Sequence, residues 1–337
     1  MNRTHSLMSP RERVFAALTH RQPDRVPRLE IWIDALLDEL GAGDAARAYV
    51  AQGQDGILLP GVNPPQSRAW RTGVDEWGRA WQDGVYVDGV VHTENDLRRY
   101  SPPLSAVNRL FDPAAVAAVR RRYPAHCLFY GTHIGPMTAA YMAMGFARFF
   151  TALVDDPPFV RRVLEARTDW CIAQFGRACE LGAELIVLGD DVAARSGPLI
   201  SPAMFRAFIL PCHCRLVAAL PVPVIWHSDG DIRSLLPLAV EAGFAGVHGL
   251  EPAAGVDLAT VKREFGRDLA LIGNVDVGVL YGDDLGAVRR EVDRCLADGA
   301  PGGGYLFASC SSIFAGLNGR AVREMFRYAA ARIEGAT

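Results

Sequence analysis

Lysine, an excess of charge of one sign and long hydrophobic runs are all scarce or missing in this chain. Lys262 is the only lysine among 35 basic residues, and 38 acidic residues leave a formal net charge of -3. Such an even balance provides no global basic field to hold nucleic acid or an anionic membrane surface. No apolar run approaches the roughly 18 residues of a membrane-spanning helix. These absences argue against a nucleic-acid-binding protein and against a membrane protein.

A disulfide framework and a secretory signal are also missing from the pattern. The chain has seven cysteines in 337 residues, and an odd number in a long chain is more typical of reduced thiols. Residues 1–13 carry charges and no apolar stretch of the kind that a signal peptide needs. We therefore expect a cytoplasmic protein. Half of the residues are hydrophobic and 22% are charged, which suits a large core and excludes a disordered chain.

Short apolar runs recur along the chain, and most of them lead into a helical pattern. Several are uninterrupted, as are parallel strands that are covered on both faces. Helix starts are marked by a capping residue followed by proline, at Ser9-Pro10 (with Glu12), Asp112-Pro113, Asp156-Pro157 and Ser201-Pro202. The eight runs are Val26–Trp32, Asp55–Pro60, Cys127–Gly131, Glu184–Gly189, Val222–His227, Ala245–Leu250, Leu269–Gly273 and Tyr305–Ser309.

Eight strands in alternation with helices predict a single (β/α)8 barrel over residues 1–337, with an N-terminal helical extension. The alternative is an open doubly wound sheet, which would need a glycine-rich phosphate loop after the first strand. The residues at that place, Ile33-Asp34-Ala35-Leu36, form no such loop. Tryptophan and glycine crowd residues 68–92, so we expect a β-hairpin insertion near residues 72–92 with Asp88-Gly89 as its turn.

Polar side chains follow the runs, at the strand ends where a barrel gathers its functional residues. A single Asp in such a loop is explained by helix capping, but the occurrence of several together with His227 and Cys310 indicates a site. We expect Asp191, His227, Glu251, Asn274 and Cys310 to line one pocket. The candidates in chain order are Glu30, Trp32, His133, Asp190, Asp191, His227, Asp229, Glu251, Asn274, Asp276 and Cys310.

His227, Asp229 and Cys310 offer a nitrogen, an oxygen and a sulfur ligand of the kinds that zinc accepts. The alternative reading makes His227 a hydrogen-bonded loop residue and Cys310 a small buried hydrophobe. The neighbouring cluster Cys212-His213-Cys214 lies in a helical pattern, where side chains two positions apart do not face each other. That cluster is therefore interpreted as structural.

Ordered motifs along the chain resemble the uroporphyrinogen decarboxylase superfamily, a barrel family that includes corrinoid-dependent methyltransferases. The resemblance runs from about residue 10 to about residue 330. Its motifs together are specific for the superfamily and leave the reaction open. They are Arg11–Leu18, Pro23–Pro27, Asp75–Gly78, Gly189–Asp191 with Ile200–Pro202, His227–Gly230, Gly249–Pro252, Gly273–Asp276 and Gly302–Tyr305.

The segment after the first run separates the two branches of this family. In true uroporphyrinogen decarboxylases it is rich in arginine, which binds substrate carboxylates. Here Leu29–Leu36 has no arginine and holds two acids, Glu30 and Asp34, which would repel a polycarboxylate. The resemblance is therefore closer to the methyltransferase branch.

The methyltransferase branch holds zinc with a His-x-Cys pair and a second, late cysteine. His227 matches the histidine and Cys310 the late cysteine, while Asp229 stands in place of the first cysteine. A carboxylate still binds zinc but makes a harder site. Glu251 is the reserve ligand or general base.

The resemblance thus implies a zinc-assisted methyltransferase that moves a methyl group between a small substrate and a corrinoid. Because no Asp-x-His-x-x-Gly signature is present, the corrinoid would be carried on a separate protein; a homodimer stays open. Catalytic roles are expected for Asp191, Glu251 and Asn274. Substrate binding is expected for Glu30, Trp32, His133, Asp190 and Asp276, and metal binding for His227, Cys310 and Asp229.

Two other functions remain open at this point. One is a decarboxylase or lyase on a small carboxylate, in which Asp190, Asp191 and His227 would handle protons. The other is a non-catalytic binding protein on the same fold, for which the replacement at Asp229 is the motivating feature.

Overall fold

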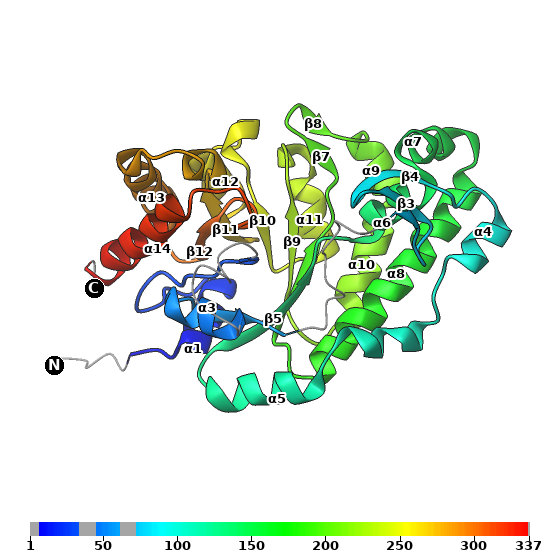
Figure 1. Cartoon of the computed structure of the whole chain (residues 1–337). Coiled ribbons are helices and arrows are strands. Elements are labelled where there is room, and N and C mark those ends of the chain that lie inside the picture. The colour runs from blue at the N-terminus through cyan, green and yellow to red at the C-terminus, as the bar shows by residue number, and fades with distance from the viewer. Residues whose placement is uncertain (1–6, 34–44, 61–71, 336–337) are drawn as a thin grey trace.

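Parallel strands in chain order build the central sheet of the computed structural model, which describes residues 7–33, 45–60 and 72–335. Within those residues the sheet has seven strands, each paired in parallel with the next. Figure 1 shows the sheet curling around, with helices outside it. The strands are β1 (Gly56–Leu58), β5 (Cys127–Thr132), β6 (Leu185–Gly189), β9 (Val224–Ser228), β10 (Gly246–Gly249), β11 (Ala270–Val275) and β12 (Tyr305–Ser309).

The first expected strand, Val26–Trp32, is not a regular strand, so the strict eight-stranded barrel is replaced by a curled seven-stranded sheet. In the described part of the chain, isolated parallel bridges and not a continuous ladder join Arg28 of this segment, and Ile33 directly after it, to the β12 side. The Leu29 amide donates to the Phe307 carbonyl (3.0 Å), and the Asp55 amide donates to the Arg28 carbonyl (2.8 Å). Pro27 lies inside the segment and has no N–H to donate, which limits a continuous ladder. The segment nevertheless lies between β12 and β1.

Helices connect the strands, and the four helix starts expected from the sequence are confirmed. Ser9 and Glu12 form a capping box on α1, and Asp112, Asp156 and Ser201 cap α5, α8 and α9. The helices are α1 (Pro10–Leu18), α3 (Ala45–Ala51), α4 (Glu94–Arg99), α5 (Pro113–Arg122), α6 (Pro136–Met144), α7 (Phe146–Asp155), α8 (Pro157–Glu180), α9 (Pro202–Phe208), α10 (Leu210–Ala219), α11 (Leu236–Ala242), α12 (Leu258–Phe265), α13 (Leu285–Gly299) and α14 (Gly319–Glu334). Short 3₁₀ helices are η2 (Leu104–Leu110), η3 (Arg233–Leu235), η4 (Pro252–Ala254) and η5 (Val277–Leu280).

The insertion near residues 72–92 is an antiparallel sheet of β2 (Gly73–Val74), β3 (Arg79–Gln82) and β4 (Val85–Gly89). The expected turn at Asp88-Gly89 is wrong, because the chain turns at Asp83-Gly84. Both of those residues have positive φ, 50° and 80°, which is the backbone that a tight two-residue hairpin requires. Gly89 instead ends β4, where an added Cβ would lie 2.3 Å from the Ala143 carbonyl oxygen.

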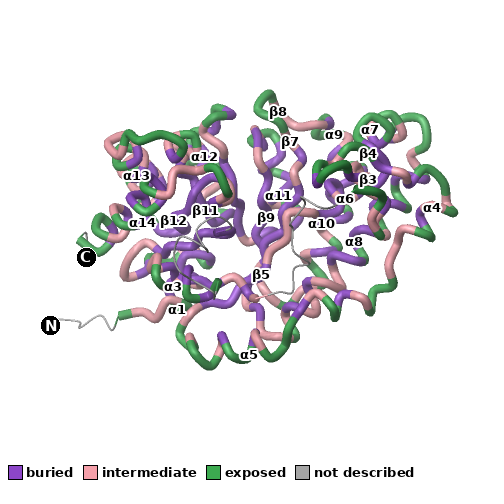
Figure 2. The backbone as a smooth tube through the Cα atoms, viewed as in Figure 1, coloured by how far each residue is buried: buried purple, intermediate pink, exposed green. Residues whose placement is uncertain are grey.

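The strands are buried on both faces, and Figure 2 shows the exposed positions on the outer helices and connecting loops. Leu185–Gly189 and Val224–Ser228 are buried at every position, as expected of parallel strands under helices. A second short pair, β7 (Ala193–Ala194) with β8 (Gly197–Pro198), follows β6. Within the described ranges no one helix has the length and apolarity to span a membrane, although α6 and α7, bent by 102°, meet that test as a pair.

Candidate metal and active site

Two histidines from neighbouring strands meet at the centre of the candidate site. In the β9–β10 register His227 and His248 are direct partners, so both side chains leave the sheet on the same side. Their Nδ1 atoms are 2.8 Å apart, and His248 Nε2 lies 3.1 Å from the Ser309 carbonyl oxygen. Burial lowers the pKa of His227, against an opposing effect of Asp229. Burial also holds the pKa of His248 well below its usual value, so both rings are neutral.

Two carboxylates face the other nitrogen of His227. His227 Nε2 lies 3.7 Å from Asp229 Oδ1 and 3.9 Å from Asp191 Oδ1. One ligand atom from each of these three residues fits within 4.8 Å of the others. Asp191 Oδ1 accepts a hydrogen bond from the Asp229 amide at 3.1 Å. Asp229 Oδ1 is buried with no hydrogen-bond partner, although the side chain as a whole is 47% exposed.

Burial sets the electrostatics of these carboxylates. It raises the pKa of Asp191 to about 6, with the hydrogen bond from the Asp229 amide lowering it and the nearby Asp190 charge raising it. Burial also raises the pKa of Asp229, while His227 lowers it and Asp191 and Glu251 raise it. Asp191 and Asp229 therefore bring two carboxylates close together beside a neutral imidazole, while Glu251 is paired with the exposed Arg195 at 3.4 Å; a positive charge between the two carboxylates would offset their repulsion.

These donors fit a divalent cation. The orphaned Asp229 Oδ1 and the second carboxylate supply negative charge, and His227 Nε2 supplies a nitrogen. One imidazole with two carboxylate oxygens is a harder donor set than thiolates and is compatible with zinc, manganese or iron. The expected ligands His227 and Asp229 are both in this cluster, and Asp191 is the third member.

Cys310 and Glu251 lie nearby but outside that three-residue cluster, within the part of the chain that is described. Burial raises the pKa of the Cys310 thiol, and the charges of Asp276, Asp229 and Glu251 raise it further. Glu251 Oε2 accepts a hydrogen bond from the Gly230 amide at 2.9 Å. Glu251 therefore joins the loop after β10 to the loop after β9.

Trp32 and His133 form an aromatic wall beside His227. The ring centroids of Trp32 and His133 are 3.8 Å apart, and the Trp32 ring is 5.1 Å from that of His227 in an edge-on arrangement. Glu30, two residues before Trp32, is 1% exposed. Its carboxylate accepts from the Ser309 amide (3.0 Å) and contacts Ser309 Oγ (2.6 Å).

The side chains of three other candidates form hydrogen bonds within the protein. Asp190 is fully buried and accepts from the Met137 and Thr138 amides at the start of α6. Asn274 Nδ2 donates to the Leu250 carbonyl (2.8 Å), and its Oδ1 accepts from Arg294 (3.1 Å). Asp276 caps η5 through the Gly278 amide. These contacts position the loops after β6 and β11. Asp34, the second acid expected near the site, lies outside the described residues.

The sequence reading missed two buried histidines. His248 lies inside the run Ala245–Leu250, which was read simply as apolar, although a polar ring in a buried strand needs a partner. His213, set aside with its neighbouring cysteines, lies 2.9 Å from Asp190 Oδ2 through Nε2. The sequence does not show that His213 of α10 faces the buried Asp190, because that contact depends on how the helix packs.

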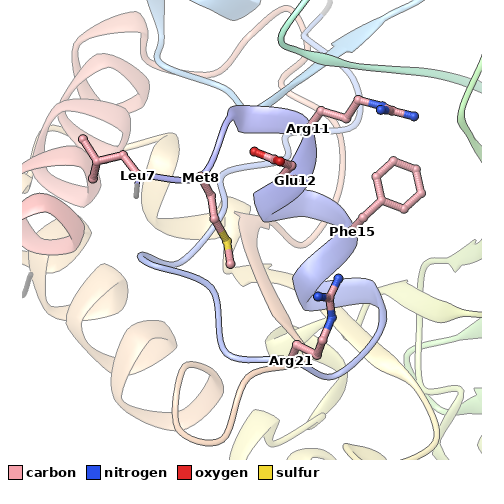
Figure 3. A pocket seen from close by; sticks show the side chains of 6 residues that line it. All are labelled: Leu7, Met8, Arg11, Glu12, Phe15 and Arg21. Atoms are coloured by element: carbon pink, nitrogen blue, oxygen red, sulfur yellow. The ribbon is translucent and has the colours of Figure 1, made fainter. Parts of the chain in front are cut away.

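A hollow of about 440 Å³ elsewhere is separate from this cluster. Figure 3 shows Leu7 and Met8 on one side of it, Arg11, Glu12 and Phe15 on α1, and Arg21 on the chain after that helix. Figure 1 places α1 at the opposite end of the sheet from β7 and β8. The histidine–carboxylate cluster, and not this hollow, is therefore the candidate site.

A curled parallel sheet with an acid–histidine cluster at its strand ends is the arrangement of a TIM-barrel-like α/β fold. The sequence profile of the uroporphyrinogen decarboxylase (URO-D) family matches residues 79–331. The chain belongs to this family.

Relatives within the family are enzymes of two kinds. The chain is 28% identical to the methylated-thiol–coenzyme M methyltransferase of Methanosarcina mazei over 48% of its own length and 43% of that enzyme's. It is 24% identical to the methylcobamide:CoM methyltransferase MtaA of Methanosarcina barkeri, over 87% of this chain and 91% of the relative. It is also 28% identical to a uroporphyrinogen decarboxylase of Neisseria meningitidis, over 64% and 62% of the two lengths. The chain thus spans less than two thirds of the length of the methylated-thiol–coenzyme M methyltransferase and of the uroporphyrinogen decarboxylase.

Solved structures show the same fold. A methyltransferase from Methanosarcina mazei superimposes with a TM-score of 0.78 at 21% identity, over 98% of this chain and 100% of the other. A B12-independent methionine synthase from Shewanella superimposes with a TM-score of 0.57 at 13% identity, over 95% and 98% of the two chains. The solved structures therefore show the fold, and methyl transfer and decarboxylation are both represented among the relatives named above.

Proposed function

We propose that this chain is a metal-dependent methyltransferase that moves a methyl group between a small substrate and a corrinoid on a separate protein. The observation that carries the proposal is the cluster of His227 Nε2 with the Asp229 and Asp191 carboxylates, in which Asp229 Oδ1 has no other partner. The match along 87% of the chain to a methylcobamide:CoM methyltransferase supports the corrinoid as methyl donor or acceptor.

The chain's own residues hold the metal and shape the space around it. His227, Asp229 and Asp191 would hold zinc and leave a fourth position open, with Cys310 from the loop after β12 as the alternative third ligand. When bound, zinc acidifies a thiol or oxygen nucleophile that occupies its open position. Glu251 is the general base that would receive the released proton, and its bond to the Gly230 amide orients it.

Aromatic side chains line the part of the site where a small substrate would bind. Trp32 and His133 lie beside His227 and can cover an apolar part of a substrate while excluding water. Asp190, Asn274 and Asp276 would act by positioning the loops that surround it. A corrinoid is far larger than this wall, so it would approach from the solvent side, where Asp191 and Asp229 are 39% and 47% exposed.

Metal analysis of the purified chain is the first test. We expect close to one zinc per chain by elemental analysis, and transfer of the methyl group of methylcobalamin to a small thiol such as coenzyme M. His227→Ala and Asp229→Ala each remove a first ligand, so both should lower zinc affinity by roughly 100-fold or more and abolish transfer. Asp191→Asn and Cys310→Ser then report which of the two supplies the next ligand.

Asp169→Asn is the matched control, because Asp169 is an exposed acid paired with Arg215 on the outer helices. It should leave the zinc content and the transfer rate unchanged. A native protein that folds but contains no zinc, manganese or iron would contradict the metal proposal.

A decarboxylase or lyase acting on a small carboxylate is the second candidate. The observation that favours it is the match to uroporphyrinogen decarboxylases together with an imidazole and two carboxylates in one cluster, which can move protons. Release of carbon dioxide from a small carboxylate by metal-free protein would favour this function. A metal-free protein with neither activity would favour the third reading, a non-catalytic binding protein.

A further inference from the structure

The Nδ1 atoms of His227 and His248 lie at hydrogen-bond distance from each other. The two rings come from paired positions of β9 and β10, with centroids 4.8 Å apart and planes at 38°. The Nδ1 atoms are 2.8 Å apart, and the residues are 3% and 0% exposed. A hydrogen bond between two ring nitrogens needs one donor and one acceptor. One ring must therefore donate through Nδ1, and the other must accept there.

Ser309 decides which ring is the donor. Its carbonyl oxygen can only accept, and it lies 3.1 Å from His248 Nε2, so that nitrogen carries a proton. An imidazole that carries its proton on Nε2 has a lone pair on Nδ1, so His248 Nδ1 accepts. His227 Nδ1 is then the donor, and His227 Nε2 is left with the lone pair that faces Asp229 and Asp191.

We propose that His248 is a positioning residue that holds His227 in the tautomer needed for metal binding. A histidine ligand must present an unprotonated nitrogen, and the bond made by its other nitrogen fixes the tautomer and the ring plane. This inference deepens the proposed metal site, and it rests on that proposal only for the metal-affinity readout. The outer partner of a ligand histidine is most often a carboxylate, a carbonyl or a water; here it is a neutral imidazole.

The position of His248 is itself fixed from two sides. The accepting Ser309 ends β12, and its amide donates to the buried Glu30 carboxylate at 3.0 Å. The Trp32 ring lies edge-on to both histidines, with centroids 5.1 Å from His227 and 6.2 Å from His248. The acceptor that sets the tautomer is therefore a backbone carbonyl oxygen at the end of a strand, and not an atom of a side chain.

Two variants of equal size test the proposal. His248→Asn keeps an acceptor oxygen near the place of Nδ1, whereas His248→Leu has the same branching and no acceptor. Both lose the bond to Ser309, so a purely structural role would affect them alike. We expect affinity for cobalt(II), measured by its visible spectrum in the full chain, to fall roughly 10- to 100-fold in the Leu variant and clearly less in the Asn variant.

The tautomer itself is measured without metal. In protein labelled with ¹⁵N at its eight histidines, the ring nitrogens of His227 are identified by their loss in His227→Gln. We expect a protonated Nδ1 and an unprotonated Nε2 in the native protein, and the reverse or a mixture in the Leu variant.

Two results would overturn the proposal: a proton on His227 Nε2 in the native protein, or equal cobalt affinities for the Leu and Asn variants. If the native protein shows the expected tautomer and binds no cobalt, the metal proposal fails and the positioning assignment stands. If cobalt binds equally to native protein and both variants, the metal proposal stands and the positioning role fails.

Discussion

Asp229 gives the candidate site its distinctive chemistry at the scale of the single residue. It stands where the methyltransferase pattern of this family has a cysteine, and it brings a carboxylate with a buried, unpartnered oxygen. With Asp191 as a neighbour, the site offers hard oxygen donors where thiolates would be soft. A harder donor set leaves more positive charge on a bound ion, and that favours acidification of its ligand.

Glu30 is a second residue whose chemistry the structure defines. Ser309 Oγ lies 2.6 Å from both Glu30 Oε1 and the Ser311 carbonyl oxygen, yet it has one proton to give. The two short contacts are satisfied together if Ser309 donates to Ser311 and a protonated Glu30 donates to Ser309. Burial raises the pKa of Glu30 to about 7, while its contacts with Ser309 lower it; an acid that keeps its proton up to neutral pH agrees with that arrangement.

Glu30→Gln should therefore stabilise the protein above neutral pH. The folded state holds the Glu30 proton up to about pH 7, while the unfolded chain releases it near pH 4.5. The native protein then binds more protons than the unfolded chain in this window, so its free energy of unfolding falls as the pH rises from about 4.5 to 7. We expect the Gln variant to gain about 3 kcal/mol over native above pH 7 and little below pH 4.5, by urea unfolding.

Glu12→Gln is the control, because Glu12 caps α1 at the surface and its pKa is lowered by the Ser9 bonds. Its effect should have the opposite sign, since a lowered pKa stabilises at higher pH. A Glu30→Gln difference that does not vary with pH would contradict the buried-acid interpretation.

At the scale of elements, the β3–β4 hairpin shows which of two Asp-Gly dipeptides forms the turn. Asp83-Gly84 and Asp88-Gly89 are equally good turn signals in the sequence. The packing of Gly89 against the Ala143 carbonyl decides between them, because only a residue without Cβ allows β4 to approach α6 so closely.

Gly84→Ala should destabilise the insertion. Gly84 has φ of 80°, where an L-residue costs roughly 1–2 kcal/mol. We expect thermal unfolding followed by circular dichroism to show a loss of about 1 kcal/mol. Gly176→Ala is the control: Gly176 lies inside α8 with open space at its Cβ, so the change should add roughly 0.5–1 kcal/mol. A turn variant as stable as the native protein would contradict the assignment of the turn.

At the scale of the whole molecule, a buried ion cluster holds the curled sheet together where the regular ladder is interrupted. Asp55 precedes β1 and is 1% exposed. It accepts from Arg13 of α1 (2.6 Å), from Arg25 (2.9 Å) and from the Arg28 amide (2.9 Å). The cluster therefore ties α1, the segment between β12 and β1, and β1 itself.

Asp55→Asn should lower the free energy of unfolding by roughly 1.5–3 kcal/mol, because it weakens the charged hydrogen bonds from Arg13 and Arg25 while Asp24 still pairs with Arg13. Urea unfolding measures the loss. The exposed pair Arg206–Glu241 supplies the comparison, since Glu241→Gln removes a partner that is 46% exposed and should cost less than about 1 kcal/mol. Equal losses for the two variants would exclude a closing role for the cluster.

Local chemistry let the sequence alone determine much of this protein. Seven of the eight apolar runs are strands, and the caps at Ser9, Asp112, Asp156 and Ser201 begin helices. Runs of buried residues and cap–proline pairs act within a few positions, so they can be read without knowing the fold. The same reasoning put polar residues at the strand ends and indicated the family.

Only the tertiary structure decided which of those residues meet. The β9–β10 register pairs His227 with His248, a residue hidden in an apolar run, and the carbonyl of Ser309 from β12 sets the direction of their bond. Packing also brought His213 against Asp190 and left the Asp229 Oδ1 atom buried without a hydrogen-bond partner. These outcomes depend on contacts between residues far apart in the chain, and such contacts leave no periodic signal in the sequence.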